Sequence, residues 1–138
     1  MAIVYFDSSA LVKLFVEEQG SDQAAELWDR CDAPVSSRLA YPEVRASIAA
    51  ARRDHRLDDG DEQRAVELWE QFWDAVRVVE FTGPVSAHAG ALAGTHGLRG
   101  ADAVHLASAA AVAPDLIIAV WDLRLATAAR RLGFSTVP

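Results

Sequence analysis

The chain of 138 residues has little cysteine, no long apolar run and no excess of positive charge. Its one cysteine, Cys31, cannot form an internal disulfide, which fits a reducing compartment such as the cytosol. Because no Cys–His cluster is present, the sequence gives little support to a zinc site. No segment has transmembrane length, and no basic region precedes the short apolar N-terminal run. We therefore expect a cytoplasmic protein with no membrane partner.

The shortage of positive charge also limits how the protein can approach a nucleic acid. The formal net charge is -7, so this is not a generally basic nucleic-acid binder. Any such contact must use a local basic patch or a bound cation. Hydrophobic residues make up 51% and charged residues 24%, as in ordinary globular proteins. The length predicts one domain spanning residues 1–138.

The most informative stretch is the N-terminal one, where an apolar, β-favouring run over residues 2–6 leads directly into Asp7, Ser8 and Ser9. Such a run is typical of a strand covered on both faces, as in a parallel sheet. Its carboxyl end would place Asp7 at the sheet edge where α/β folds bind ligands. The alternative is that Asp7 only caps the following helix, and this stretch alone favours neither interpretation.

The remaining chain alternates between strand and helix patterns. Strands are predicted over residues 2–6, 35–37, 77–81, 116–121 and 134–137. Helices are predicted over residues 8–18, 22–31, 38–53, 63–76, 84–95, 101–112 and 123–132. This alternation predicts a three-layer α/β/α sandwich with a mainly parallel five-stranded sheet. In the fourth helix, an apolar stripe that includes Leu68, Trp69 and Trp73 favours a core position over a partner-binding groove.

Four carboxylates stand out in this layout. Asp7 and Asp122 each follow a predicted strand, whereas Glu43 and Asp102 lie near the starts of helices, among apolar and small neighbours. Gathering several ionised, unpaired carboxylates costs several kcal/mol, and a divalent cation removes that cost. Ligands that are all oxygen favour Mg²⁺ or Mn²⁺ over zinc. Such a site suits phosphodiester hydrolysis, and the cation would also let an acidic protein approach an anionic substrate. Each acid taken alone is equally explained as a helix cap or a salt-bridge partner.

Four segments carry a resemblance to a known family. They are VYFDSSALVK at residues 4–13, LAYPEV at 39–44, LRGADAVHLA at 98–107 and VWDLRL at 120–125. In their order and spacing they resemble the PIN-domain ribonucleases, and specifically the VapC-type toxins of bacterial toxin–antitoxin pairs. The resemblance covers essentially the whole chain.

The resemblance implies a PIN-like fold with strand order 3-2-1-4-5. It also implies that Asp7, Glu43, Asp102 and Asp122 form a catalytic, metal-binding quartet. The implied activity is Mg²⁺- or Mn²⁺-dependent endonucleolytic cleavage of RNA. The implied partners are an RNA substrate, a cognate antitoxin that neutralises the toxin, and a second copy of the chain in a homodimer.

Two departures from the family pattern concern hydroxyl groups. The family often has Thr where this chain has Ser8, which keeps the hydroxyl, and Thr where this chain has Val120, which does not. Ser9 is therefore a secondary candidate that could compensate for Val120. His105 lies one turn after Asp102, and a buried structural role is favoured over that of a general base.

Arginine supplies almost all of the positive charge. Arg99, beside Asp102, is a candidate RNA contact, although it could instead pair with a neighbouring acid. Further arginines recur at near-helical spacing on and after the predicted helix 38–53, where a solvated face is favoured over an RNA contact. They are Arg38, Arg45, Arg52 and Arg56.

Two other classes of function remain open. A noncatalytic PIN-like binding module would keep the fold without the metal chemistry. A phosphatase or phospho-receiver would also place an Asp after the first strand. The phosphatase motif, however, requires a second Asp where this chain has Ser9, and a receiver requires a lysine after its last strand, whereas Lys13 is the sole lysine.

Overall fold

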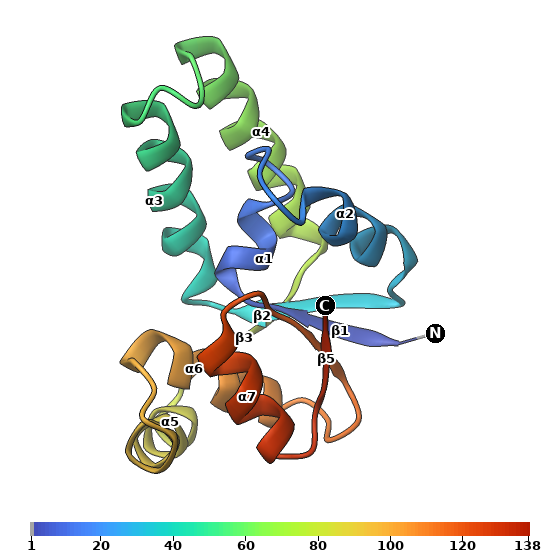
Figure 1. Ribbon diagram of the computed structural model, residues 1–138, viewed down its shortest axis with the longest axis vertical. Coiled ribbons are helices and arrows are strands. Elements are labelled where there is room, and N and C mark those ends of the chain that lie inside the picture. Colours follow the sequence, from blue (N-terminus) through green and yellow to red (C-terminus); the bar gives the residue numbers. More distant parts are fainter. Residues whose placement is uncertain (1) are drawn as a thin grey trace.

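The protein, described by a computed structural model over residues 2–138, is built around one five-stranded sheet (Figure 1). Its strands are β1 (Ile3–Phe6), β2 (Ala33–Ser37), β3 (Arg77–Val79), β4 (Ile117–Ala119) and β5 (Ser135–Val137). The spatial order is β3-β2-β1-β4-β5, and every neighbouring pair is parallel. The expected fold class and strand order are both confirmed.

Helices cover both faces of the sheet. Helices α1 (Ser8–Val12), α2 (Ser21–Arg30), α3 (Ala40–Arg53) and α4 (Asp59–Ala75) lie on one face (Figure 1). On the other lie α5 (Gly83–His96), α6 (Gly100–Ala110) and α7 (Leu123–Arg131). Helices α3 and α4 continue beyond the sheet as a projecting hairpin. Among residues 2–138, no helix is long and apolar enough to cross a membrane.

Strand β1 divides the core into two clusters. Because side chains alternate along a strand, Val4 and Phe6 pack with the α1–α4 layer, whereas Tyr5 packs with the α5–α7 layer. All three are at most 2% exposed. Burial on both faces explains why the N-terminal run is apolar without interruption.

The aromatic stripe of α4 forms part of the core. Trp69 is fully buried and packs edge-on against Phe15, with ring centroids 5.5 Å apart. Trp73 lies beside it at 5.1 Å. The core prediction is therefore confirmed for Trp69, whereas Leu68 is 46% exposed. Leu68 lies one residue before Trp69, and consecutive helical residues point in different directions.

Two helix boundaries differ from the sequence prediction by four residues or more, whereas the others agree within two residues. Helix α1 ends at Val12, because the next backbone N–H groups bond three residues back and the chain then turns. After this turn, Gly20 adopts a left-handed φ of 92° and packs against Trp121, a contact that no local pattern reveals. Helix α4 begins four residues earlier than predicted, because the Asp58 side chain caps it by accepting from the Asp61 backbone N–H.

Candidate active site

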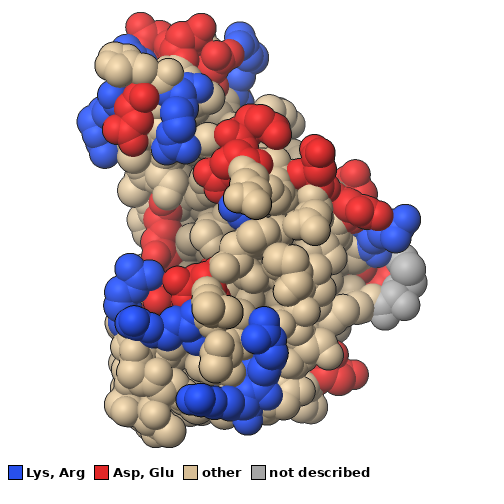
Figure 2. Space-filling view, viewed as in Figure 1, with Lys and Arg blue, Asp and Glu red and all other residues tan. Residues whose placement is uncertain are grey.

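A cavity of about 470 Å³ lies at the carboxyl ends of β1 and β4, where parallel sheets commonly bind ligands. In Figure 2, acidic side chains lie in a hollow below the projecting α3–α4 hairpin, with basic side chains beneath them. The structure brings all four predicted carboxylates to this cavity. Its lining consists of Asp7, Ser8, Ser9, Glu43, Ala46, Ser47, Arg99, Asp102, His105, Trp121 and Asp122.

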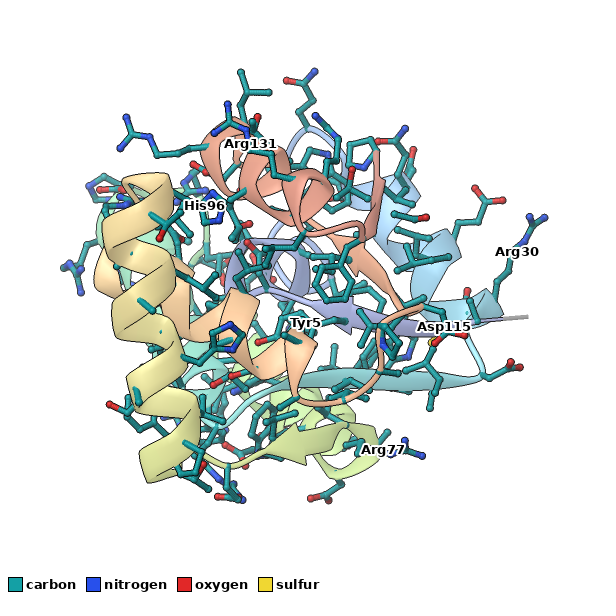
Figure 3. All side chains as sticks on the ribbon, turned by 90° about the horizontal axis from the view of Figure 1, so that it is seen from below. Tyr5, Arg30, Arg77, His96, Asp115 and Arg131 are labelled. Carbon is teal, nitrogen blue, oxygen red and sulfur yellow. The ribbon has the colours of Figure 1, made fainter. Side chains whose placement is uncertain are left out.

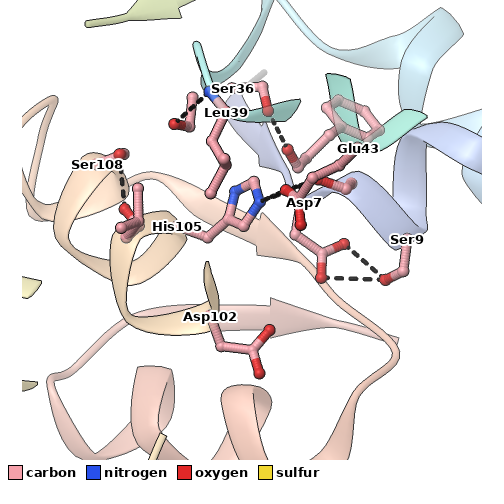
Figure 4. Close-up of polar contacts among 12 residues, drawn as sticks. Asp7, Ser9, Ser36, Leu39, Glu43, Asp102, His105 and Ser108 are labelled. Atoms are coloured by element: carbon pink, nitrogen blue, oxygen red, sulfur yellow. Dashed lines mark hydrogen bonds and ion pairs between the residues drawn. The ribbon is translucent and has the colours of Figure 1, made fainter. Parts of the chain in front are cut away.

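Asp7 is the most buried of the four acids, at 5% exposed. It caps α1 by accepting from the Ala10 backbone N–H at 2.9 Å, and the Ser9 hydroxyl lies 2.9 and 3.0 Å from its two oxygens (Figure 4). No Lys, Arg or His within residues 2–138 forms a salt bridge with it. Burial raises the pKa of the Asp7 carboxyl above its ordinary value, although nearby His105 opposes the shift. Asp7 thus caps α1, as one interpretation had it, but within residues 2–138 the buried carboxylate forms no salt bridge.

Glu43, in the first turn of α3, is held by partners from two other elements. His105 Nε2 lies 2.7 Å from Glu43 Oε1, and the Ser8 hydroxyl donates to the same oxygen. Burial opposes ionisation of Glu43, but these hydrogen bonds outweigh it and lower the pKa of the carboxyl. Glu43 therefore stays ionised beside Asp7.

His105 connects the cavity to the core. It is 3% exposed, and its Nδ1 lies 2.7 Å from the Tyr5 hydroxyl. Burial and the charge of Asp7 raise the pKa of Tyr5 well above its ordinary value, so the hydroxyl keeps its proton. Because the Glu43 carboxylate can only accept, we assign the ring proton of His105 to Nε2, and in this tautomer Nδ1 accepts a hydrogen bond from the Tyr5 hydroxyl. The expected buried, hydrogen-bonded histidine is present, and it is aimed at a cavity carboxylate.

The other two acids lie on the α6 and α7 side of the cavity. Asp102 is in the first turn of α6, and its Oδ2 accepts from Arg99 Nε at 3.1 Å. Asp122 caps α7, accepting from the Leu125 backbone N–H at 2.8 Å. Arg99 therefore pairs with an acid, as the alternative interpretation had it, and its side chain is nevertheless 75% exposed.

The donor chemistry of the cavity fits a hard divalent cation. Its four carboxylates and the hydroxyls of Ser8 and Ser9 supply oxygen ligands. The buried Asp7 carboxylate, whose pKa is raised by burial, is the feature that a cation would neutralise. In the rotamers present, each acid turns toward its own donors, and among the described residues no three acidic, His or Cys side chains are placed to share one ion. Their roles as metal ligands remain predictions.

The two residues before Asp122 have different roles: Val120 is a departure from the family pattern, and Trp121 is a cavity residue. Val120 is 2% exposed and packs in the core cluster of the α5–α7 layer, so its side chain is part of the core. Trp121, which the sequence analysis did not single out, lines the cavity beside Asp122. The sequence signal that could have identified Trp121 was its position directly before Asp122, the acid after the predicted fourth strand.

The four arginines at near-helical spacing on or beside α3 are engaged in ion pairs. Arg38 pairs with Glu80, and Arg45 lies 3.4 Å from Glu70. Arg52 and Arg56 likewise have acidic partners. These contacts agree with the favoured interpretation of a solvated face.

Comparison with known proteins places the chain in a family. Residues 4–129 match the PIN domain family. The chain is 58% identical to ribonuclease VapC49 of Mycobacterium tuberculosis H37Rv over 139 residues, which cover 100% of this chain and 96% of that protein. Ribonuclease VapC46 of the same strain is 35% identical over 143 residues, covering 99% of this chain and 98% of that protein. The chain therefore belongs to the PIN-domain family and, within it, to the VapC group.

Solved structures share the fold at low sequence identity. FitAcB from Neisseria gonorrhoeae superposes with a TM-score of 0.74 at 18% identity, covering 98% of this chain and 96% of that one. VapBC2 from Rickettsia felis, bound to a DNA fragment from its promoter, superposes with a TM-score of 0.66 at 12% identity. The match covers 98% of this chain and 97% of that one. At these identities the likeness concerns the fold alone.

Proposed function

We propose that the whole chain forms one cytoplasmic domain that acts as a Mg²⁺- or Mn²⁺-dependent endoribonuclease toxin. The observation that carries this proposal is the buried Asp7 carboxylate, which forms no salt bridge within residues 2–138 and lies in a cavity shared with three further acids. The ribonuclease activity named for the VapC relatives, at 58% and 35% identity over nearly the full chain, supports the same assignment.

Asp7, Glu43, Asp102 and Asp122 are the residues that would hold the cation. When bound, a divalent cation supplies a Lewis acid for water activation and for the charge that develops on phosphate oxygens. The chain's own groups prepare the site for it. Ser9 and the Ala10 N–H orient Asp7, while His105 and Ser8 keep Glu43 ionised and fixed in position.

The four acids reach the cavity from different parts of the fold. Asp7 follows β1, Glu43 stands on α3, Asp102 on α6, and Asp122 between β4 and α7. Because each is held by a cap or a hydrogen bond, little reorganisation is required of the backbone when substrate arrives. Ser8 and Ser9 are therefore proposed as orienting groups for Glu43 and Asp7.

The decisive experiment is cleavage of end-labelled single-stranded RNA by the purified chain in Mg²⁺, in Mn²⁺ and in EDTA. We expect cleavage with either metal and none in EDTA. Asp7→Asn and Asp102→Asn should each abolish it while retaining the far-UV circular dichroism of the folded protein. Arg77→Gln, an exposed substitution on β3, serves as the matched control for handling and contamination.

A noncatalytic PIN-like module is the competing assignment, and metal binding separates the two. Calorimetry with Mn²⁺ should show binding to the wild-type chain and not to Asp7→Asn. A folded wild-type protein that neither binds Mn²⁺ nor cleaves RNA would establish the module instead.

We also propose a cognate antitoxin as a partner and a homodimer as the free form. Support for the antitoxin comes from the toxin–antitoxin complex of Klebsiella pneumoniae, which shares the fold with a TM-score of 0.60 at 23% identity. The homodimer rests on the family resemblance. The test is co-expression with the product of an adjacent small reading frame, followed by sizing of the free and bound chain. The complex should cleave RNA far more slowly than the free chain.

A further inference from the structure

A second cavity, of about 430 Å³, lies between the end of α5 and one face of α7. Arg124, Thr127 and Arg131 line it from α7, where their spacing places them on a single side of the helix. His96, the last residue of α5, lines it from the opposite wall. In Figure 3, His96 and Arg131 lie on the same side of the molecule, well away from Arg77 on β3.

The charge of this cavity is not neutralised. Arg124 and Arg131 are both exposed, and within residues 2–138 neither forms a salt bridge. Arg45 and Arg52 of α3, by contrast, have acidic partners. In a chain of net charge -7, two such arginines on one wall form a local basic patch.

The basic cavity adjoins the acidic one at two points. Trp121 and Asp122 line the acidic cavity, and the next residues, Leu123 and Arg124, line the basic one. The turn between α5 and α6 makes the second connection, because it separates His96 in the basic cavity from Arg99 in the acidic one. Figure 2 shows basic side chains directly beneath the acidic hollow.

His96 adds a polar group to this surface. Its Nδ1 is buried and has no hydrogen-bond partner within the described part of the chain. Because a buried N–H without an acceptor is rare, the ring proton belongs on Nε2. That N–H is then a donor for an oxygen atom in the cavity.

We propose that the basic cavity binds the phosphate backbone of single-stranded RNA next to the phosphate held at the acidic site. This inference rests on the proposed function. The acidic cavity repels nucleotides on either side of the cleaved bond, and Arg124 and Arg131 offer the adjoining phosphates a favourable path along α7. The contacts are to backbone, so they supply affinity without selecting a sequence.

The test measures RNA binding by fluorescence anisotropy in EDTA, so that cleavage does not interfere. The probe is a fluorescein-labelled single-stranded RNA of about a dozen nucleotides, long enough to span both cavities. Arg124→Gln/Arg131→Gln should weaken binding about tenfold and lower the slope of log affinity against log salt by about 1 to 2. Arg53→Gln/Arg77→Gln is the matched control, because it removes two exposed arginines that have no salt bridge in residues 2–138.

A second probe locates the effect. An RNA of only three or four nucleotides fills the acidic cavity alone, so in Mg²⁺ the wild-type and the Arg124→Gln/Arg131→Gln chain should cleave it at equal initial rates. Equal loss for the test and control variants with the longer RNA would overturn the proposal, because only total charge would then matter. Loss of antitoxin capture with unchanged RNA binding would also overturn it and assign the surface to a protein.

Failure of this inference is distinguishable from failure of the proposed function. If the wild-type chain cleaves RNA in Mg²⁺ and the double variant binds and cleaves equally well, the inference alone is wrong. If the wild-type chain does not cleave RNA at all, the proposed function is wrong. The anisotropy comparison still decides whether α7 binds the backbone.

Discussion

The hydroxyl of Tyr5 donates to Nδ1 of His105 across 2.7 Å, joining residues that are 100 positions apart in the sequence. Tyr5 belongs to β1 and His105 to α6, and the other side of the imidazole contacts Glu43 on α3. One buried chain of hydrogen bonds therefore connects the sheet and both helical layers to a carboxylate of the cavity.

The first prediction concerns this chain of hydrogen bonds. Tyr5→Phe keeps the edge-on packing against His105 but leaves Nδ1 without its donor, so the tautomer that serves Glu43 is no longer fixed. We expect RNA cleavage to fall roughly tenfold, in line with effects of supporting hydrogen bonds around metal sites. The free energy of unfolding should fall by about 1–3 kcal/mol, because a buried acceptor loses its partner.

Tyr41→Phe is the matched control, since it removes the hydroxyl of the other tyrosine, which donates to the exposed Glu70. Denaturant unfolding and initial cleavage rates should both stay near the wild-type values. Equal effects of the two substitutions would show that the Tyr5 hydroxyl has no special connection to the site.

The second prediction is that Asp7→Asn stabilises the protein while abolishing activity. Burial raises the pKa of Asp7 in the folded protein. At a pH between the pKa of Asp7 in the unfolded state and its pKa in the folded state, the folded protein therefore binds more protons. The stability of the wild-type protein therefore falls as pH rises through the folded pKa. Because Asn also caps helices, Asp7→Asn should raise the free energy of unfolding at neutral pH by on the order of 1 kcal/mol.

Urea denaturation from acidic to neutral pH measures the free energy of unfolding of both proteins. The stability gained by Asp7→Asn over the wild type should shrink as pH falls. Asp122→Asn is the control, because it alters a capping carboxylate that is only partly buried. Millimolar Mg²⁺ should stabilise the wild-type chain and not Asp7→Asn. An Asp7→Asn protein that is less stable than wild type at neutral pH would show that its charge is compensated.

The third prediction uses the contact between Gly20 and Trp121. A Cβ on Gly20 would lie 2.6 Å from Trp121 Nε1, and its φ of 92° disfavours any side chain. Gly20→Ala should destabilise the fold by about 2–4 kcal/mol, combining backbone strain with a displaced indole. Because Trp121 lines the cavity, cleavage should fall as well.

Gly133→Ala provides the comparison for strain alone. Gly133 has nearly the same φ, 93°, but no atom lies within 4 Å of the added Cβ. Its substitution should cost about 1–2 kcal/mol and leave cleavage at temperatures below unfolding unchanged. Thermal melts of the two variants measure the difference, and equal melting temperatures would contradict the proposed clash.

The fourth prediction separates the two interpretations of Arg99. Its ion pair with Asp102 is solvent-exposed on the arginine side and should contribute only about 0–1 kcal/mol to stability. If Arg99 contacts RNA, Arg99→Gln should raise the KM for RNA several-fold with little change in melting temperature. Arg30→Gln, which also breaks an exposed ion pair, should leave both quantities unchanged. An unaltered KM for Arg99→Gln would show that Arg99 pairs with Asp102 and does not contact RNA.

The sequence was most informative where local pattern and tertiary burial agree. The apolar run before Asp7 predicts a strand buried on both faces, and β1 is one. The strand alternation predicts the layers, whereas the strand order came from the family resemblance. Asp7, Glu43, Asp102 and Asp122 could be chosen because strand ends and helix starts of a parallel sheet converge at one edge.

What the sequence could not supply depends on contacts between distant residues. The close approach of Gly20 to Trp121 joins distant parts of the chain, and the partners of His105 come from β1 and α3. Ion pairing decides which arginines remain available: Arg45 and Arg52 of α3 have acidic partners, whereas Arg124 and Arg131 have none within residues 2–138.

The distribution of the four acids along the chain has a consequence for synthesis of the protein. They stand at positions 7, 43, 102 and 122, and β5, the strand beside β4, is the last element. Under the proposed function, a chain interrupted before residue 122 lacks at least one acid and an edge of the sheet. We then expect products that stop before Asp122 to leave RNA uncleaved.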